Sequence, residues 1–164
     1  MKVAVLLGSD SDLPRLEPCF EALRRLAIPF EAHVLSAHRT PRQLVLYVEA
    51  AERERGVGIF ICAAGGAAHL AGVVAAHSDR PVIGVPLDNP PLGGLDALLA
   101  TVQMPAGIPV ATVAVGGGGP ANAALLAARI LALADPALAA RVQALRAEQA
   151  DAVARKDARL QEKL

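Results

Sequence analysis

The sequence predicts an α/β fold built on one parallel sheet, and two observations support this prediction. Five short runs rich in Val, Ile, Leu and Ala are each followed by a segment with helical patterning. Strands and helices that alternate in this way form parallel sheets with right-handed crossovers. A cluster of Gly, Ser, His or Pro also follows each run. Because parallel strands end at the same edge of a sheet, where open α/β sheets bind ligands, we expect these clusters to form one site.

The expected elements alternate along the whole chain. Strands are expected at Lys2–Leu7, Phe30–Leu35, Gly58–Cys62, Pro81–Val85 and Ala111–Val115. Helices are expected from about Ser11, from Thr40 to about Arg55, and at about Ala67–His77, Gly94–Gln103, Pro120–Leu133 and Ala137–Gln161. A capping side chain and a proline mark the start of three helices, with Ser11 or Asp12 before Pro14, Thr40 before Pro41 and Asp135 before Pro136.

Length and composition indicate one domain. The 164 residues suffice for a single domain, 1–164, with a core over about 2–133 and a helical extension over about 136–161. Apolar residues make up 54% of the chain and aromatic residues only 2%, so Ala, Val, Leu and Ile must fill the core. Continuous runs of such residues are typical of parallel strands buried on both faces. The spacing in the polar extension is consistent with a helix on its own domain and equally with one that reaches a neighbouring subunit.

Composition also excludes several classes of function. The chain has 16 Lys and Arg, 16 Asp and Glu, and no basic stripe with interleaved aromatics, so we expect no nucleic-acid partner. No apolar stretch is long enough to span a bilayer and no signal peptide precedes the first strand, so we expect a cytoplasmic protein without membrane contact. Cys19 and Cys62 are too few for a disulfide framework or a zinc site, and we expect both to be small core residues.

The turn after the first strand is suited to bind an anion. Gly8 lets the backbone approach a ligand, and the hydroxyls of Ser9 and Ser11 with the helix N–H groups suit a phosphate. Asp12 would be repelled by a phosphate and is better suited to a sugar hydroxyl. A capped turn without a ligand would have the same residues, and the Gly-x-Gly-x-x-Gly dinucleotide fingerprint is absent.

The turn after the second strand places a histidine beside an arginine. Arg39 can bind a phosphate with two parallel hydrogen bonds, and His38 can carry a proton near neutral pH. Ser36 precedes them in the same turn. A polar surface turn without function is the alternative interpretation.

The turn after the third strand has almost no side chains. Ala64, Gly65 and Gly66 offer backbone N–H groups and a small-walled pocket that could hold a carboxylate or a planar ring. Close packing of a helix on the sheet would require the same small residues. His69 precedes Leu70 at a helical position, which is consistent with a core histidine as well as with a ligand-binding one.

The last glycine cluster and the other two histidines do not indicate a particular function. Gly116–Gly119 fits a ligand loop or a crowded subunit contact, and we expect His33 and His77 to be structural or solvent-facing. No pair of His, Cys or carboxylate residues has metal-ligand spacing, and no Ser–His–Asp arrangement indicates a nucleophile. The residues alone indicate a small anionic ligand such as a nucleotide, with a histidine as proton carrier.

Six segments of the chain, spread over about residues 2–133, resemble the class I PurE family in their order and spacing. They are Gly8-Ser9-x-Ser11-Asp12, Ser36-Ala37-His38-Arg39-Thr40-Pro41, Gly65-Gly66-Ala67-Ala68-His69-Leu70-x-Gly72, Gly84-Val85-Pro86, Val102-Gln103-Met104-Pro105-x-Gly107-Ile108-Pro109-Val110 and Asn122-Ala123-Ala124-Leu125-Leu126-Ala127-Ala128. This family comprises the N5-carboxyaminoimidazole ribonucleotide mutases of bacterial purine synthesis.

The resemblance implies a flavodoxin-like three-layer αβα sandwich with five parallel strands and an extra C-terminal helix, assembled as a homo-octamer. It implies transfer of a carboxylate from the exocyclic nitrogen of the ribonucleotide to ring carbon C4, by decarboxylation and recarboxylation, without cofactor or metal. His38 would be the proton carrier. The matching substrate-binding residues are Ser9, Ser11, Asp12, Ser36, Arg39, Ala64, Gly65, Gly66, His69 and Leu70.

Three positions depart from the family pattern, and two other functions remain open. Ala63 stands where glycine is usual, Ala71 where proline is usual, and Gly117 where lysine is common. The related class II carboxylases use free carbon dioxide and aminoimidazole ribonucleotide. In those enzymes the motif that resembles Ser36–Thr40 has lysine after the histidine, and the Gly-Gly-Ala-Ala-His loop is absent. Arg39 and Gly65–His69 therefore favour class I. A non-catalytic flavin- or nucleotide-binding module could also share the fold.

Overall fold

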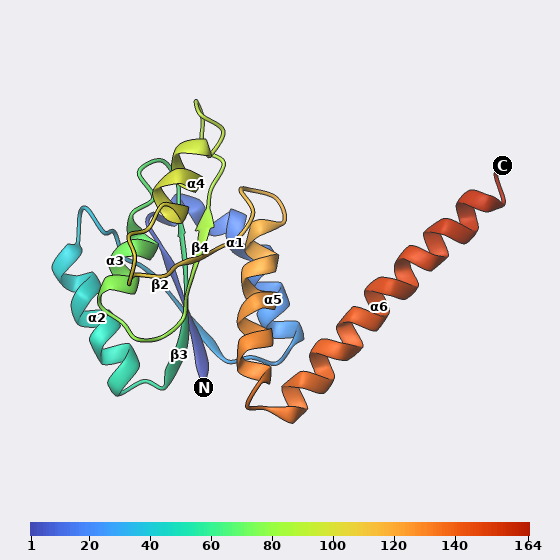
Figure 1. Cartoon of the computed structure of the whole chain (residues 1–164), viewed down its shortest axis with the longest axis horizontal. Helices are drawn as coiled ribbons and strands as arrows, with labels where there is room; N and C mark the ends of the chain where they lie inside the picture. Colours follow the sequence, from blue (N-terminus) through green and yellow to red (C-terminus); the bar gives the residue numbers. More distant parts are fainter.

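The chain forms one parallel sheet between two layers of helices (Figure 1). The computed structural model describes residues 1–164. The strands are β1 (Lys2–Leu7), β2 (Phe30–Val34), β3 (Val57–Ala64), β4 (Val82–Pro86) and β5 (Ala111–Thr112). They are all parallel and lie in the order β2-β1-β3-β4-β5, which confirms the α/β sandwich with a flavodoxin-like arrangement.

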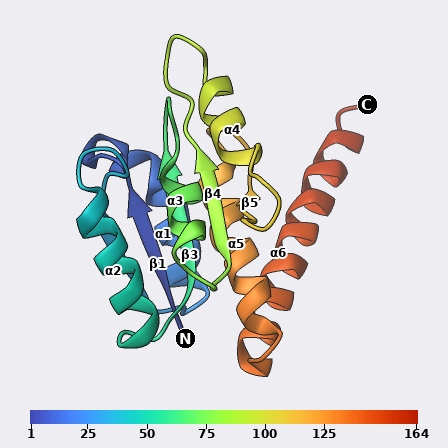
Figure 2. The same ribbon diagram turned by 60° about the vertical axis from the view of Figure 1, so that its left-hand side comes forward.

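Helices cover both faces of this sheet (Figure 2). They are α1 (Leu13–Arg25), α2 (Pro41–Arg53), α3 (Leu70–Ala76), α4 (Leu95–Val102), α5 (Gly119–Ala132) and α6 (Pro136–Gln161), and a short 3-10 helix η1 (Asp10–Asp12) precedes α1. Helices α1 and α5 pack on one face, and α2 and α3 on the other. No helix has both the length and the apolar character needed to cross a membrane.

The core consists of two clusters, one on each face of the sheet. Alternate residues of β3 belong to different clusters. Ile59 and Ile61 pack toward α1 and α5, whereas Phe60 packs toward α2 and α3. Both faces of the central strands are therefore buried, as the continuous apolar runs predict. Cys19 and Cys62 are free and buried, and burial raises the pKa of the Cys19 thiol to about 12.

Two predicted element boundaries are wrong at the edge that carries the glycine-rich turns. The fifth strand pairs regularly only over Ala111–Thr112, and beyond it single hydrogen bonds to β4 remain, from Val113 N to Gly84 O at 3.1 Å and from Gly116 N to Pro86 O at 3.2 Å. The third helix begins at Leu70 rather than at Ala67. Gly66 has a φ of 62°, and Ala68 N donates to Gly66 O at 2.8 Å, so a tight turn occupies the predicted first helical turn. This turn keeps the small-residue loop open at the end of β3.

The predicted N-cap positions are confirmed at all three helices, with Asp12 before α1, Thr40 before α2 and Asp135 before α6, but only one of these side chains makes a capping hydrogen bond. Asp135 caps α6, because its Oδ1 accepts a hydrogen bond from Leu138 N at 3.0 Å. Asp12 makes no side-chain capping bond to α1, and Ser9 instead caps the preceding 3-10 helix η1, where its Oγ accepts from Ser11 N at 3.3 Å. Thr40 makes no cap for α2, because its hydroxyl instead accepts from Ser36 N at 2.9 Å. The side chains expected to cap helices therefore shape the turns that precede them.

Helix α6 contacts the body of the protein only through its first half (Figure 1). Leu138 and Leu145 are its buried residues, and Arg141 Nε donates to Leu26 O at 2.8 Å. Glu148 pairs with Arg25 at the end of α1. Beyond that pair almost every residue is exposed, and the helix projects away from the sheet.

Candidate active site

The predicted site residues converge at the carboxyl ends of β1, β2 and β3. A cavity of about 220 Å³ lies there. It is lined by Gly8, Ser9, Ser11, Asp12, Ser36, Ala37, His38, Arg39, Ala64, Gly65, Ala67, Leu70 and Asn89. Three turns that are far apart in the sequence thus form one pocket, as expected from the parallel topology.

One side of the pocket carries the groups suited to a phosphate. The Arg39 guanidinium donates to Gly8 O at 3.2 Å, which ties the second turn to the first. The hydroxyls of Ser9 and Ser11 lie 2.8 Å apart. Arg39 N donates to Ser36 Oγ at 3.2 Å, so Ser36 orders the backbone beneath the arginine. A cation and two hydroxyls therefore face the same small space.

Asp12 is the one buried carboxylate of the pocket wall. It is 8% exposed. Burial raises the pKa of its carboxyl above the usual value, and the nearby Arg15 guanidinium and the hydrogen bond to the Ser9 backbone oppose that rise. A partly desolvated carboxylate gains most from hydroxyl donors, which suits the sugar hydroxyls expected for this residue.

His38 and His69 are hydrogen-bonded to each other. The distance from His38 Nε2 to His69 Nδ1 is 2.8 Å, and the two rings meet edge to face at an angle of 80°. A bond between two imidazole nitrogens holds one proton, because one nitrogen must donate and the other accept. Both side chains are exposed to solvent at the pocket rim. His69 is therefore not a core histidine, and the structure pairs it with the predicted proton carrier.

The small-residue loop forms the opposite wall. Ala64, Gly65 and Ala67 line the cavity, whereas Gly66 provides the turn behind them. His69 likewise lies outside the cavity and contacts it through His38. This wall offers backbone and methyl groups and no charged side chain, so it suits a small ligand that has to be enclosed rather than bound tightly.

The three departures from the family pattern lie outside the cavity. Ala63 is fully buried in the core cluster on the α1 and α5 face. Ala71 is buried on the other face, near Gly84. Gly117 is exposed, and a side chain there would meet no atom within 4 Å. None of the three substitutions removes a group that lines the pocket.

Asn89 is the polar pocket residue that the sequence interpretation missed. It belongs to the loop between β4 and α4, where two prolines and two glycines leave no periodic pattern to interpret. Leu87 N donates to Ala64 O at 3.0 Å, which holds this loop against the end of β3. The sequence signal that could have identified Asn89 is its place just after the fourth strand, because the carboxyl end of β4 lies at the same edge of the sheet as the other turns.

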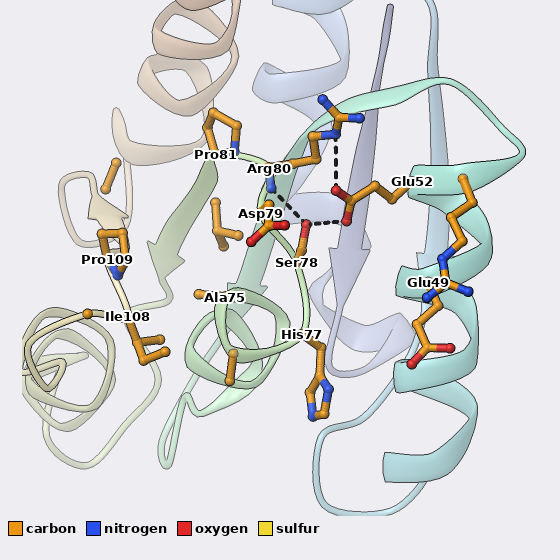
Figure 3. Close-up of a pocket in the computed structure, with 15 residues that line it drawn as sticks. Glu49, Glu52, Ala75, His77, Ser78, Asp79, Arg80, Pro81, Ile108 and Pro109 are labelled. Carbon is orange, nitrogen blue, oxygen red and sulfur yellow. Dashed lines mark hydrogen bonds and ion pairs between the residues drawn. The ribbon is translucent and has the colours of Figure 1, made fainter.

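A second, larger groove lies near the amino-terminal ends of the strands (Figure 3). Its volume is about 1,090 Å³, and none of the predicted site residues lines it. Glu52 accepts a hydrogen bond from Ser78 Oγ at 3.0 Å and lies 3.3 Å from Arg80 Nε. Two of its charged side chains, Glu52 and Arg80, are paired with each other. The smaller cavity is therefore the better candidate for an active site.

The chain is similar to known proteins over almost its whole length. Residues 2–152 match the family model described as AIR carboxylase. The N5-carboxyaminoimidazole ribonucleotide mutase of Mycobacterium tuberculosis strain H37Rv is 53% identical over 98% of this chain and 90% of its own length. The mutase of Brucella melitensis is 50% identical over 93% of each chain. The crystal structure of Treponema denticola PurE superposes with a TM-score of 0.88 at 30% identity, covering 96% of this chain and 97% of its own. The chain therefore belongs to the AIR carboxylase family.

Proposed function

We propose that this protein is an N5-carboxyaminoimidazole ribonucleotide mutase of purine biosynthesis. Relatives that bear this name are about half identical to the chain over almost its whole length. The observation that carries the proposal is the pocket in which His38, paired with His69, faces both the Arg39 turn and the small-residue loop. A proton carrier, an anion-binding turn and an uncharged wall are the three parts that the reaction requires.

The ribose phosphate is bound by the turns after β1 and β2. Arg39 with the hydroxyls of Ser9 and Ser11 binds the phosphate, and Asp12 binds the sugar hydroxyls. Arginine and hydroxyl donors match the phosphate oxygens, and the carboxylate accepts from the ribose. The cavity is smaller than the roughly 300–1,000 Å³ of most ligand sites, so part of the nucleotide extends beyond it.

His38 moves the proton in both halves of the reaction. In the first half the imidazolium protonates the carbamate nitrogen, the N–C bond breaks with its electron pair remaining on nitrogen, and carbon dioxide is released. In the second half C4 of the electron-rich ring attacks that carbon dioxide, and the C4 proton returns to His38. Proton donation followed by proton uptake regenerates the starting state of the enzyme.

The wall of Ala64, Gly65 and Ala67 with Leu70 encloses the carbon dioxide between the two halves. Carbon dioxide has no charge and few hydrogen-bonding groups, so proximity and exclusion of water hold it better than any single contact. His69 Nδ1 hydrogen-bonds His38 Nε2 and thereby orients the ring.

Carboxylation of aminoimidazole ribonucleotide with free carbon dioxide is the second candidate function, because the family model is described as AIR carboxylase. Incubation with each ribonucleotide at ambient bicarbonate separates the two reactions by the absorbance of the carboxylated product. We expect rapid conversion of the N-carboxylated nucleotide and little conversion of aminoimidazole ribonucleotide. If aminoimidazole ribonucleotide were instead the preferred substrate, the protein would be a carboxylase and not a mutase.

We also propose a homo-octamer located in the cytoplasm. Helix α4 exposes Leu95 at 56%, Leu99 at 48% and Val102 at 47%, with Leu92 at 60% just before it. These residues have helical spacing and share one face, which is typical of a surface that another chain covers. The unsupported second half of α6 is a further surface available to a neighbouring subunit.

A further inference from the structure

We infer that Asn89, oriented by Arg15, positions the migrating carboxylate of the substrate in the pocket. This inference rests on the proposed mutase function and adds a residue outside the three turns discussed above. Asn89 lines the cavity together with His38 and Gly65. It extends from the loop between β4 and α4, and Arg15 reaches it from the first turn of α1.

Arg15 determines which end of the Asn89 amide faces the pocket wall. The Arg15 guanidinium hydrogen-bonds Asn89 Oδ1 and lies 3.6 Å from Asp88 Oδ1. A guanidinium has only donors, so it requires the oxygen end of the amide. The nitrogen end therefore turns toward Gly65, where a Cβ would lie 2.0 Å from Asn89 Nδ2. None of the hydrogen bonds formed within the chain uses Nδ2, so its protons are available to a ligand.

The backbone around Asn89 holds this arrangement in place. Asn89 N donates to Leu87 O at 3.0 Å, and Leu87 N is bonded to the end of β3. On the other side Asp88 packs against two glycines: a Cβ on Gly94 would lie 2.9 Å from Asp88 Cα, and one on Gly116 would lie 2.9 Å from Asp88 Cγ. Both glycines have positive φ, at 85° and 60°. The loop is thus held against the end of β3 and the turn at Gly116, and the Asn89 side chain has a defined direction.

The chemistry of the reaction explains why an uncharged donor suits this place. The wall formed by Ala64, Gly65 and Ala67 has no side-chain donor for a carboxylate. A lysine or arginine would bind the carboxylate strongly and the neutral carbon dioxide weakly, and would therefore oppose decarboxylation. An uncharged amide N–H binds the carboxylate less strongly than a cation would, so less binding energy is lost when the carboxylate becomes neutral carbon dioxide. Arg15 polarises that amide while its own charge stays behind Oδ1.

The test compares two nucleotides that differ only in the carboxylate. Carboxyaminoimidazole ribonucleotide carries the group, and aminoimidazole ribonucleotide lacks it. We expect Asn89→Ala to weaken binding of the carboxylated nucleotide by about 10- to 100-fold and to change binding of the other by less than about threefold. Asn89→Asp should weaken binding of the carboxylated nucleotide further than Asn89→Ala does, because the aspartate presents an anionic oxygen to the carboxylate while it retains the Arg15 contact. Its melting temperature should not fall, since the bridge remains.

Two arginine variants complete the experiment. Arg15→Met frees the Asn89 amide to rotate. It should weaken binding of the carboxylated nucleotide, but by less than Asn89→Ala does. Arg25→Met is the matched control, because Arg25 lies at the other end of α1 and pairs with Glu148. It should bind both nucleotides as the unaltered chain does.

Two results would overturn the inference alone. The first is equal weakening of both nucleotides in the Asn89 variants, which would assign Asn89 a purely structural role. The second is unchanged binding of the carboxylated nucleotide in Asn89→Asp. If the unaltered chain binds neither nucleotide, the proposed function itself fails, and this inference fails with it.

Discussion

At the scale of single residues, the contact between His38 and His69 is the feature on which the mechanism depends. The 2.8 Å separation of their nitrogens leaves room for one proton between the rings. A carrier that must first give and later regain a proton benefits from a partner that fixes its orientation in both states. We therefore propose His69 as a positioning residue and His38 as the residue that reacts.

We expect His38→Asn to retain the fold and substrate binding and to lose about two to four orders of magnitude in kcat, because asparagine cannot carry the proton. Steady-state rates with the N-carboxylated nucleotide, together with a binding measurement, provide the check. His77→Asn is the matched control, since His77 is exposed in the distant groove. Near-normal turnover of His38→Asn would refute the assignment.

Much of the site could be predicted at this scale, and the exceptions have a physical cause. His38 and Arg39 stand directly after a strand, so chain order alone brings them to the ligand-binding edge of the sheet. The position of Asn89 depends on Gly94 at the end of the same loop and on Gly116 beyond β5, because both leave room for Asp88. The pairing of His69 with His38 likewise follows from the tight turn at Gly66, which replaces the expected first turn of the helix. Contacts of this kind are tertiary, and local patterns do not contain them.

At the scale of elements, a charge cluster joins β1, β2 and α2. Glu31 accepts hydrogen bonds from Lys2 at 2.7 Å, from Tyr47 at 2.7 Å and from Arg55 at 3.0 Å. Burial alone would raise the pKa of the Glu31 carboxyl, but these three donors outweigh it and lower the pKa from 4.5 to about 2. The cluster therefore holds the edge strand β2 to its neighbours.

This cluster predicts an acid-dependent loss of stability. Above the unfolded pKa of 4.5 the carboxylate is charged in both states and its full contribution is present. That contribution is on the order of 3 kcal/mol. As the pH falls from 4.5 toward about 2, the unfolded state gains a proton first and the contribution is lost. Urea unfolding at a series of pH values should show that Glu31→Gln is destabilised near neutral pH.

The difference between that variant and the unaltered chain should shrink toward low pH. Glu17→Gln is the control, because Glu17 forms an ion pair with Arg24 in which both side chains are at least half exposed. Such exposed pairs contribute about 1 kcal/mol or less. A constant difference for Glu31→Gln across the acid range would contradict the role assigned to the cluster.

The element boundaries show why some of the fold was predictable and some was not. The four longer strands lie within two residues of their expected bounds. The apolar runs of β1, β3 and β4 are almost entirely buried, whereas β2 is a partly exposed edge strand. The fifth strand is shorter than expected, since the run Ala111–Val115 continues past its last pairing with β4. An apolar run indicates that a segment is buried, but it does not indicate where its regular pairing with a neighbouring strand ends.

At the scale of the whole molecule, the surface of α4 indicates assembly. We expect light scattering at micromolar concentration to show eight chains, and Leu95→Asp with Leu99→Asp to give smaller particles that remain folded, because a buried unpaired carboxylate is costly. Leu133→Asp is the control, since this isolated side chain is 89% exposed. A fully active monomer would contradict the octamer.

The central claim is that the carbon dioxide released from the nitrogen is the one that C4 attacks. Substrate labelled at the carbamate carbon, supplied in unlabelled bicarbonate, tests this claim directly at early times. We predict that most of the carboxylated product retains the label, because in the proposed mechanism the wall of Ala64, Gly65 and Ala67 encloses the intermediate beside His38. Product that carries mainly unlabelled carboxylate would show that carbon dioxide enters from solution, and it would replace the mutase with the carboxylase.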